Sequence, residues 1–299
     1  MPSPAVHAFV SLFHMPLFFM LSGYLARPRE LGVYAWRRAI ALLLPYAAFL
    51  LLVTALDFAL SWVDGVPAQM ANGSLAVRAE QLLLGGTLLT RIYGVFWFVT
   101  CLYFTGQLFN LASAVPRISR WLLGALALAG CVVSYRSIRG GLPLGFMNVP
   151  LAFFFYWLGS LAAGVRRMPI WAWPVCLLVL LPLSRIAPAF EMKYSMYGSF
   201  PINVAAAAVG ALAVVSLASF IPDEGRPGRI FASLGRASLV IMFLHQLVHY
   251  RIAHRIPEWA VVVLALLLPW LAYQAFDRSA LTRLLFLGRS ARSRAHAGT

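Results

Sequence analysis

Repeated apolar stretches of membrane-spanning length constrain this chain more than any other feature. Nine stretches are apolar and nearly free of charged residues, at about 5–26, 39–56, 92–115, 121–135, 146–165, 170–187, 202–221, 231–250 and 259–276. A helix needs roughly 20 apolar residues to cross a bilayer. The chain is 62% hydrophobic and 11% charged, whereas about a quarter of the residues in a soluble domain are charged. We therefore predict an all-α fold, a polytopic transmembrane helix bundle with about nine spans.

The remaining residues are too few for a separate soluble domain. Residues 74–90 are too polar to span the bilayer, and we expect them to lie along its interface. Residues 277–299 follow the final apolar stretch and contain five arginines. We therefore divide the chain into a transmembrane domain, residues 1–276, and a basic cytoplasmic tail, residues 277–299.

The charge of the chain predicts its orientation in the membrane. The formal net charge is +15, from 24 Lys and Arg against 9 Asp and Glu. These cations are scattered between apolar runs, which is typical of membrane loops and argues against a nucleic-acid-binding surface. The loops after spans 1, 3, 5 and 7, together with the tail, hold 15 cations, and the other loops hold 8. We expect the C-terminus in the cytoplasm and Met1 outside, which suggests one further span upstream of this sequence.

Few His, Lys, Arg, Asp or Glu side chains lie at depth in the predicted spans. His14 is near the middle of the first span, and Arg236 lies inside the eighth. Ionisable groups at such depth are costly unless they face a partner or a cavity, so they are candidates for function. Ser238 and His245 are seven residues apart and fall on one face of a helix. The three cysteines all lie inside apolar runs, which argues against disulfides and against a cysteine-based metal site.

Four segments, in order along nearly the whole chain, resemble motifs of one membrane family. They are FHMPLFFMLSGYL at 13–25, WRRAIALLLPY at 36–46, FWFVTCLY at 96–103 and LGRASLVIMFLH at 234–245. The chain resembles the acyltransferase-3 family, particularly its fucose 4-O-acetylase-like members. The resemblance implies a membrane O-acyltransferase with about ten helices in the plasma (inner) membrane of a bacterium. It also implies acetyl-CoA or another acyl-CoA as donor, and a saccharide or lipid-linked glycan as acceptor.

The chain departs from this family in two places. The family's first helix, with an Arg and a catalytic His about eleven residues later, has no counterpart before Met1. The Arg-x-x-Arg element is incomplete, because Arg38 fits its first position and Ala41 occupies the second. Arg37 can substitute in part.

Acyl transfer to a hydroxyl needs a base, usually His near neutral pH, and cations for the phosphates of the donor. The candidate catalytic bases are His14 and His245. The candidate donor-binding residues are Arg37, Arg38 and Arg236. The candidate acceptor-binding residues are Ser22, Tyr24, Trp97 and Ser238.

Each assignment has a plainer alternative. The paired arginines can be topological anchors, and each His can be a hydrogen-bonded structural group. Ser22 can mediate helix packing, and Trp97 can be a pocket wall or an interface anchor. No metal site is expected, because Gln246 replaces the Glu of a zinc-protease H-E-x-x-H motif.

Two other functions compete with the acyltransferase reading. A transporter or flippase would also place Pro, Arg and His within spans, although the sequence holds no pair of matching halves. The chain could instead be an inactive, N-terminally truncated family member, in which case the base is missing rather than replaced by His14.

Overall fold

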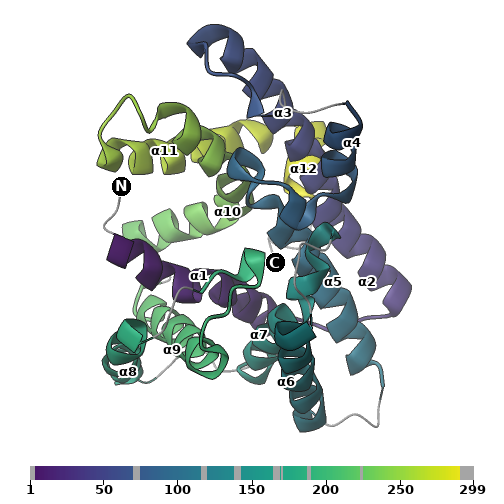
Figure 1. The fold of residues 1–299 in the computed structure, drawn as a ribbon, viewed down its shortest axis with the longest axis vertical. Helices are drawn as coiled ribbons and strands as arrows, with labels where there is room; N and C mark the ends of the chain where they lie inside the picture. The colour runs from purple at the N-terminus through teal and green to yellow at the C-terminus, as the bar shows by residue number, and fades with distance from the viewer. Residues whose placement is uncertain are drawn as a thin grey trace. The chain divides into compact units, whose positions relative to one another are not determined.

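The computed structural model describes residues 4–69, 75–115, 120–137, 143–163, 169, 171–186, 190–222 and 225–289 (Figure 1). These residues form helices, short turns of 3-10 and π type, and an isolated β-bridge between Glu191 and Met196. They fall into two compact units, each described by itself below.

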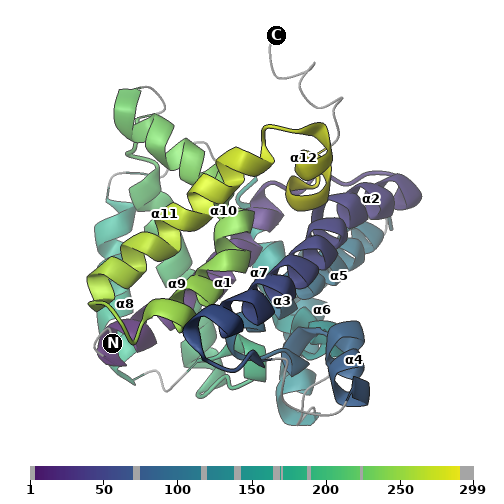
Figure 2. The same ribbon diagram turned by 90° about the horizontal axis from the view of Figure 1, so that it is seen from above.

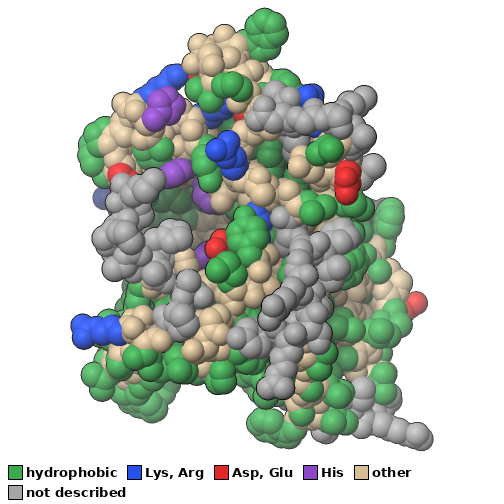
Figure 3. Space-filling model, in the orientation of Figure 1, with side chains coloured by type: hydrophobic (Ala, Val, Ile, Leu, Met, Phe, Trp, Pro, Cys, Tyr) green, Lys and Arg blue, Asp and Glu red, His purple; other side chains and the backbone are tan. Residues whose placement is uncertain are grey.

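Helices of membrane-spanning length make up most of the described chain. Six helical segments there are long and apolar enough to cross a bilayer: Leu31–Asp64, Arg91–Ser113, Leu144–Leu161, Phe200–Ala218, Gly225–Ile252 and Glu258–Phe276. Three shorter apolar helices are Phe9–Tyr24, Trp121–Val133 and Ala172–Ile186. Together they coincide with the nine predicted stretches, and the prediction of an all-α polytopic fold is confirmed. Large apolar side chains are exposed on these helices, and Figure 3 shows them spread over the face that it draws.

Unit 1 comprises Met1–Tyr34, Phe104–Gly141 and Gly145–Arg229. Its helices are α1 (Pro4–Tyr24), α6 (Arg120–Ser137), α7 (Val149–Leu161), α8 (Ala172–Ile186) and α9 (Phe200–Ala218), with the 3-10 turns η5 (Pro143–Asn148) and η6 (Met192–Tyr194). Parts of α2 (Leu31–Arg38), α5 (Phe96–Ser113) and α10 (Gly225–Ile252) belong to it as well.

Glycines bring α1 and α7 into backbone contact. A Cβ added to Gly23 would overlap the backbone of Tyr156, and one added to Gly159 would overlap the backbone of Met20. Helix association in membranes depends on van der Waals packing, and small residues allow the backbones to approach closely. The Ser-Gly-Tyr sequence at the end of α1 therefore has a packing role in unit 1.

Unit 2 comprises Ala35–Tyr103, Leu142–Leu144 and Ile230–Thr299. Its elements are η1 (Ala39–Leu43), α3 (Leu44–Asp64), α4 (Leu75–Leu84), η3 (Gly86–Leu88), η4 (Arg91–Tyr93), α11 (Glu258–Phe276) and α12 (Ala280–Leu287), with the remaining parts of α2, α5 and α10.

Stacked aromatic rings form the core of unit 2. The Phe49 ring of α3 stacks on Phe243 of α10 with ring centroids 4.7 Å apart, and Phe96 packs against the same Phe243 ring. Phe276 and Phe286 stack at 4.2 Å, and both contact Phe49. These contacts seat α12 against α3 (Figure 2).

A proline explains the π-turn η1 between α2 and α3. Pro45 has no N–H, so the carbonyl of Ala41 loses its normal α-helical partner four residues later. The helical turn contains one extra residue there, and the N–H of Leu44 donates to the carbonyl of Ala39, five residues back. Gly288, at φ +61°, lies so close to Ala41 that an added Cβ would overlap that residue's backbone. Ala41 is thus covered by the segment after α12.

One predicted boundary needs correction. The span expected between Arg38 and Asp57 is one continuous helix from Leu31 to Asp64, because hydropathy marks where a helix enters lipid and not where the helix ends. Helix α12 forms within the predicted tail, residues 277–299, of which 290–299 lie outside the described ranges. The cytoplasmic location of this tail stays a prediction.

Substitution of Gly23 by Ala tests the contact between α1 and α7. A Cβ at this position has no room against the Tyr156 backbone, and overpacking costs about 1–3 kcal/mol or more. Gly32 in α2 is the matched control, because nothing lies within 4 Å of an added Cβ there. Gly23→Ala should lower the thermal unfolding midpoint of the detergent-solubilised protein, whereas Gly32→Ala should leave it unchanged or raise it. Equal midpoints for both variants would contradict the close approach.

Candidate functional site

The two candidate histidines have the same hydrogen-bond arrangement, one in each unit. In unit 1, Nδ1 of His14 lies 3.1 Å from the carbonyl oxygen of Val10. In unit 2, Nδ1 of His245 lies 3.0 Å from the carbonyl of Ile241 and 2.8 Å from that of Met242. A carbonyl accepts but does not donate, so Nδ1 carries the proton in a neutral ring. Nε2 is then the unprotonated nitrogen, which is the form that a general base requires.

Other candidates on α1 serve the helix itself. The Ser22 hydroxyl donates to the Phe18 carbonyl at 2.8 Å, one turn back. Pro16 is buried and lies within α1, which continues through it. Ser22 and Tyr24 are both half-buried. Their place on either side of Gly23, the contact point with α7, supports the packing alternative for Ser22, while a role in acceptor binding stays a prediction.

Helix α10 separates two candidates that the sequence motif groups together. It is one unbroken helix from Gly225 to Ile252, so residue positions on it advance by about 100° each. Ser238 and His245 therefore share a face, as predicted. Arg236 is nine residues before His245 and points to the opposite side of the helix, where it is exposed. Within unit 2, α10 thus does not bring Arg236 and His245 together.

The remaining predicted residues also lie in unit 2. Arg37, which is exposed, and Arg38, which is half-buried, form the last turn of α2. Trp97 is only 3% exposed, near the start of α5. Such burial excludes a role as a lipid-interface anchor and leaves the wall of a packed interior. None of these positions by itself assigns a ligand.

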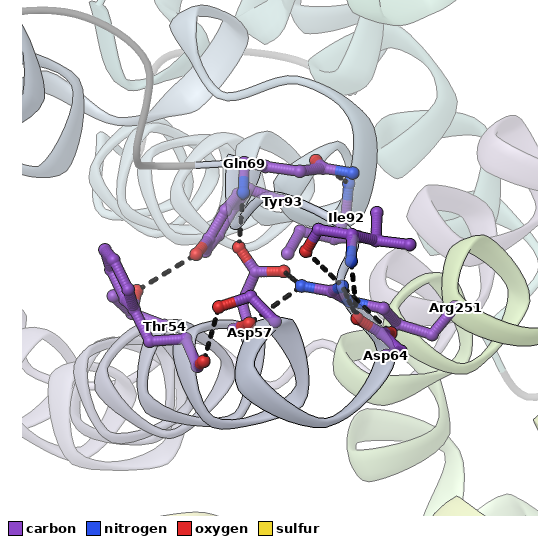
Figure 4. A network of polar contacts seen from close by, with 10 residues as sticks. Thr54, Asp57, Asp64, Gln69, Ile92, Tyr93 and Arg251 are labelled. Carbon is purple, nitrogen blue, oxygen red and sulfur yellow. Dashed lines mark hydrogen bonds and ion pairs between the residues drawn. The ribbon is translucent and has the colours of Figure 1, made fainter.

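The densest charged network in unit 2 was not predicted from the sequence. The guanidinium of Arg251, on α10, forms ion pairs with Asp57 and Asp64, both on α3 (Figure 4). It also donates to the carbonyls of Asp57, at 2.7 Å, and Val66, at 3.1 Å. Asp57 is fully buried and Arg251 is 6% exposed. A pair buried this deeply costs desolvation, which the surrounding hydrogen bonds offset.

Further hydrogen bonds connect this cluster to the segment before α5. The backbone N–H of Gln69 donates to Asp57 Oδ2 at 2.7 Å, and the Gln69 side-chain oxygen accepts from the Ile92 N–H at 3.2 Å. Nearby, the Tyr93 hydroxyl donates to Thr54 on α3 at 3.2 Å. The network therefore joins α3, α10 and η4, and it fixes the end of the helix that bears His245.

A second polar network orders the turn between α8 and α9 in unit 1. Asn148, fully buried, accepts from the Tyr197 hydroxyl at 3.0 Å and from the Ser195 hydroxyl at 3.1 Å. Its amide donates to the carbonyl of Lys193 at 3.3 Å. The Lys193 ammonium lies 4.9 Å from the ring centroid of Tyr194. Burial lowers the pKa of Lys193 from 10.5 to about 8, although nearby Glu191 acts in the opposite direction.

In the described part of the chain, no group of three or more His, Cys, Asp or Glu side chains is placed to hold a metal ion.

Comparison with known proteins gives two matches. Residues 2–275 match the family model described as an acyltransferase domain, acyltransferase 3. The nodulation protein NolL of Mesorhizobium japonicum is 29% identical over 185 residues, which is 58% of this chain and 43% of NolL. The matched region thus spans less than half of that relative. No solved structure matches the chain.

Replacement of Arg251 tests the ion-pair network. Arg251→Met leaves two buried carboxylates without their cation, and breaking a buried pair typically costs about 3–5 kcal/mol. The thermal unfolding midpoint in detergent should fall markedly, and Arg278→Met, at an exposed position after α11, should leave it unchanged. A variant as stable as the wild type would show that the network does not stabilise unit 2.

The pH dependence of stability tests the environment of Lys193. Because the folded-state pKa is about 8 and the unfolded value about 10.5, the charged form destabilises the fold below pH 8, and this cost disappears as the pH rises towards 10.5. Lys193→Met should be more stable than the wild type at pH 7, by roughly 1–3 kcal/mol, and the difference should shrink by pH 10. A difference that is constant between pH 7 and 10 would rule out the lowered pKa.

Proposed function

The chain belongs to the acyltransferase-3 family, and from this membership we propose that it moves an acyl group from acyl-CoA to a hydroxyl of a saccharide or glycan. The observation that carries the proposal is the family match over residues 2–275, which extends across nearly the whole membrane-spanning chain. The acyl group that we propose is acetyl, and acetyl-CoA is the proposed donor. We place the reaction in a bacterial plasma membrane.

The reaction requires one proton acceptor. The acceptor hydroxyl attacks the thioester carbon and its proton passes to Nε2 of a histidine. The carbon–sulfur bond then breaks, and the CoA thiolate takes up that proton, so the products are an ester and free CoA thiol. His14 and His245 both suit this role, because Nδ1 of each lies against a helix carbonyl, so that Nε2 is the unprotonated nitrogen of the neutral ring.

Cations are needed at the donor end of the reaction. Exposed Arg236 and Arg37, and half-buried Arg38, suit the phosphates of CoA because a guanidinium binds two oxygens at once. Arg236 lies on the face of α10 opposite His245. This position is consistent with a donor nucleotide that is bound away from the reacting carbon. Ser22, Tyr24, Trp97 and Ser238 are the proposed acceptor contacts.

Kinetic variants in membranes test these roles. One histidine acts as the base, and replacing it, by His14→Gln or His245→Gln, should lower kcat by about 100-fold or more. Arg236→Gln should mainly raise KM for acyl-CoA. His249→Gln is the matched control, since it is an exposed histidine one turn further along α10. Wild-type activity in all three test variants would overturn the site assignment. Saccharide movement across the membrane without consumption of acyl-CoA would favour the transporter alternative.

A further inference from the structure

The loop between α1 and α2 is held in place by one side chain of α5. Asn110 Oδ1 accepts from the backbone N–H of Arg29 at 2.9 Å, and Asn110 Nδ2 donates to the carbonyl of Arg29 at 3.0 Å. All of these atoms belong to unit 1. The side-chain amide thus binds both backbone polar groups of one residue, which fixes the backbone orientation of Arg29 and the direction of its Cα–Cβ bond.

The loop itself has little freedom. At its first end, the N–H groups of Leu25 and Ala26 donate to carbonyls of α1. At its second end, the Glu30 carbonyl accepts from the N–H of Tyr34 and begins α2. Pro28 lies between, and its ring fixes φ. The backbone of residues 25–30 is therefore held in one conformation.

Two unpaired guanidinium groups project from this loop. Arg27 and Arg29 are both exposed, and among the described residues no carboxylate forms an ion pair with either of them. Glu30 is adjacent, so the charge of the loop remains positive by one unit. Two exposed arginines separated by one proline bring several N–H donors to one short loop, which suits an anion with more than one oxygen.

The burial of Asn110 indicates that the loop between α1 and α2 has a role beyond connecting the two helices. Its side chain is 2% exposed on a membrane-spanning helix, where an amide is costly unless it is hydrogen-bonded. A loop at the membrane surface can satisfy its backbone with water, so it does not need such a partner. A buried amide that rigidifies an exposed basic loop lowers the ordering cost of binding at that loop.

We propose that the Arg27–Pro28–Arg29 loop is a preorganised phosphate-binding site and that Asn110 is the positioning residue for it. The bound phosphate is one of those in the acyl-CoA nucleotide, an assignment that rests on the proposed function and on the expected cytoplasmic side of this loop. The same chemistry is present in the headgroup of an anionic lipid. The two sources are separated by the experiment below.

The test measures CoA binding to the purified chain in phosphatidylcholine nanodiscs by calorimetry. Arg29→Gln should weaken CoA binding by about tenfold, since one charge-assisted hydrogen-bonded contact is lost. Asn110→Leu should weaken it by a few-fold through the loop alone. The matched control is Arg185→Gln, an exposed arginine in the last turn of α8 in the same unit, which should change binding less than twofold.

A second measurement separates the loss of a phosphate contact from misfolding, and CoA from lipid. Arg29→Gln keeps both backbone hydrogen bonds, so its unfolding midpoint should equal that of the wild type. Lipid that co-purifies from phosphatidylglycerol-containing membranes is then quantified by mass spectrometry. Loss of phosphatidylglycerol with unchanged CoA affinity would support the phosphate site and assign it to lipid.

The outcomes distinguish this inference from the proposed function. If the wild type binds no CoA, the proposed donor is wrong. The lipid measurement alone then tests whether the Arg27–Pro28–Arg29 loop binds phosphate. If the wild type binds CoA but Arg27→Gln, Arg29→Gln and Asn110→Leu retain both its CoA affinity and its bound lipid, the phosphate site is overturned.

Discussion

A bilayer interior supplies no hydrogen bonds, and this constraint accounts for most of the structure. Any polar group within a span must find its partner in the protein. The Arg251 guanidinium does so with two carboxylates and two backbone carbonyls, and Asn110 does so with both backbone groups of Arg29. Such contacts fix helix ends and loops more firmly than apolar packing against lipid can, because lipid is as apolar as the side chains that it meets.

The same constraint determines which ring nitrogen of the two candidate histidines carries the proton. Ring nitrogen Nδ1 of both His14 and His245 lies against a carbonyl of its own helix, which satisfies a polar atom in an apolar setting and leaves Nε2 as a proton acceptor. Glycines such as Gly23 and Gly159 allow α1 and α7 to touch along their backbones. The residues of the Ser-Gly-Tyr motif therefore contribute to packing, whatever further part Ser22 and Tyr24 have in acceptor binding.

Sequence alone predicted the spans because the bilayer imposes a length and a hydropathy that are readable from neighbouring residues. It predicted the common face of Ser238 and His245 for the same local reason, and the same rule would have shown that Arg236 points away. It did not predict the pairing of Arg251 with Asp57, because these residues are 194 positions apart and a single sequence does not show which distant residues meet. Asp57 between apolar runs was the available signal. The packing of α12 against α3 likewise depends on contacts that a single sequence does not show, whereas Pro45 was the local signal for the π-turn.

The most direct test of the proposed acyl transfer follows an isotope-labelled acetyl group from acetyl-CoA to the saccharide. Inverted membrane vesicles containing the chain would receive ¹³C-acetyl-CoA on their exposed cytoplasmic face, and their saccharides would be analysed by mass spectrometry. The account predicts a labelled ester on a sugar hydroxyl and an equal amount of free CoA thiol, both absent from vesicles without the chain. Intact acetyl-CoA and unlabelled saccharide, in vesicles that contain the folded protein, would contradict it.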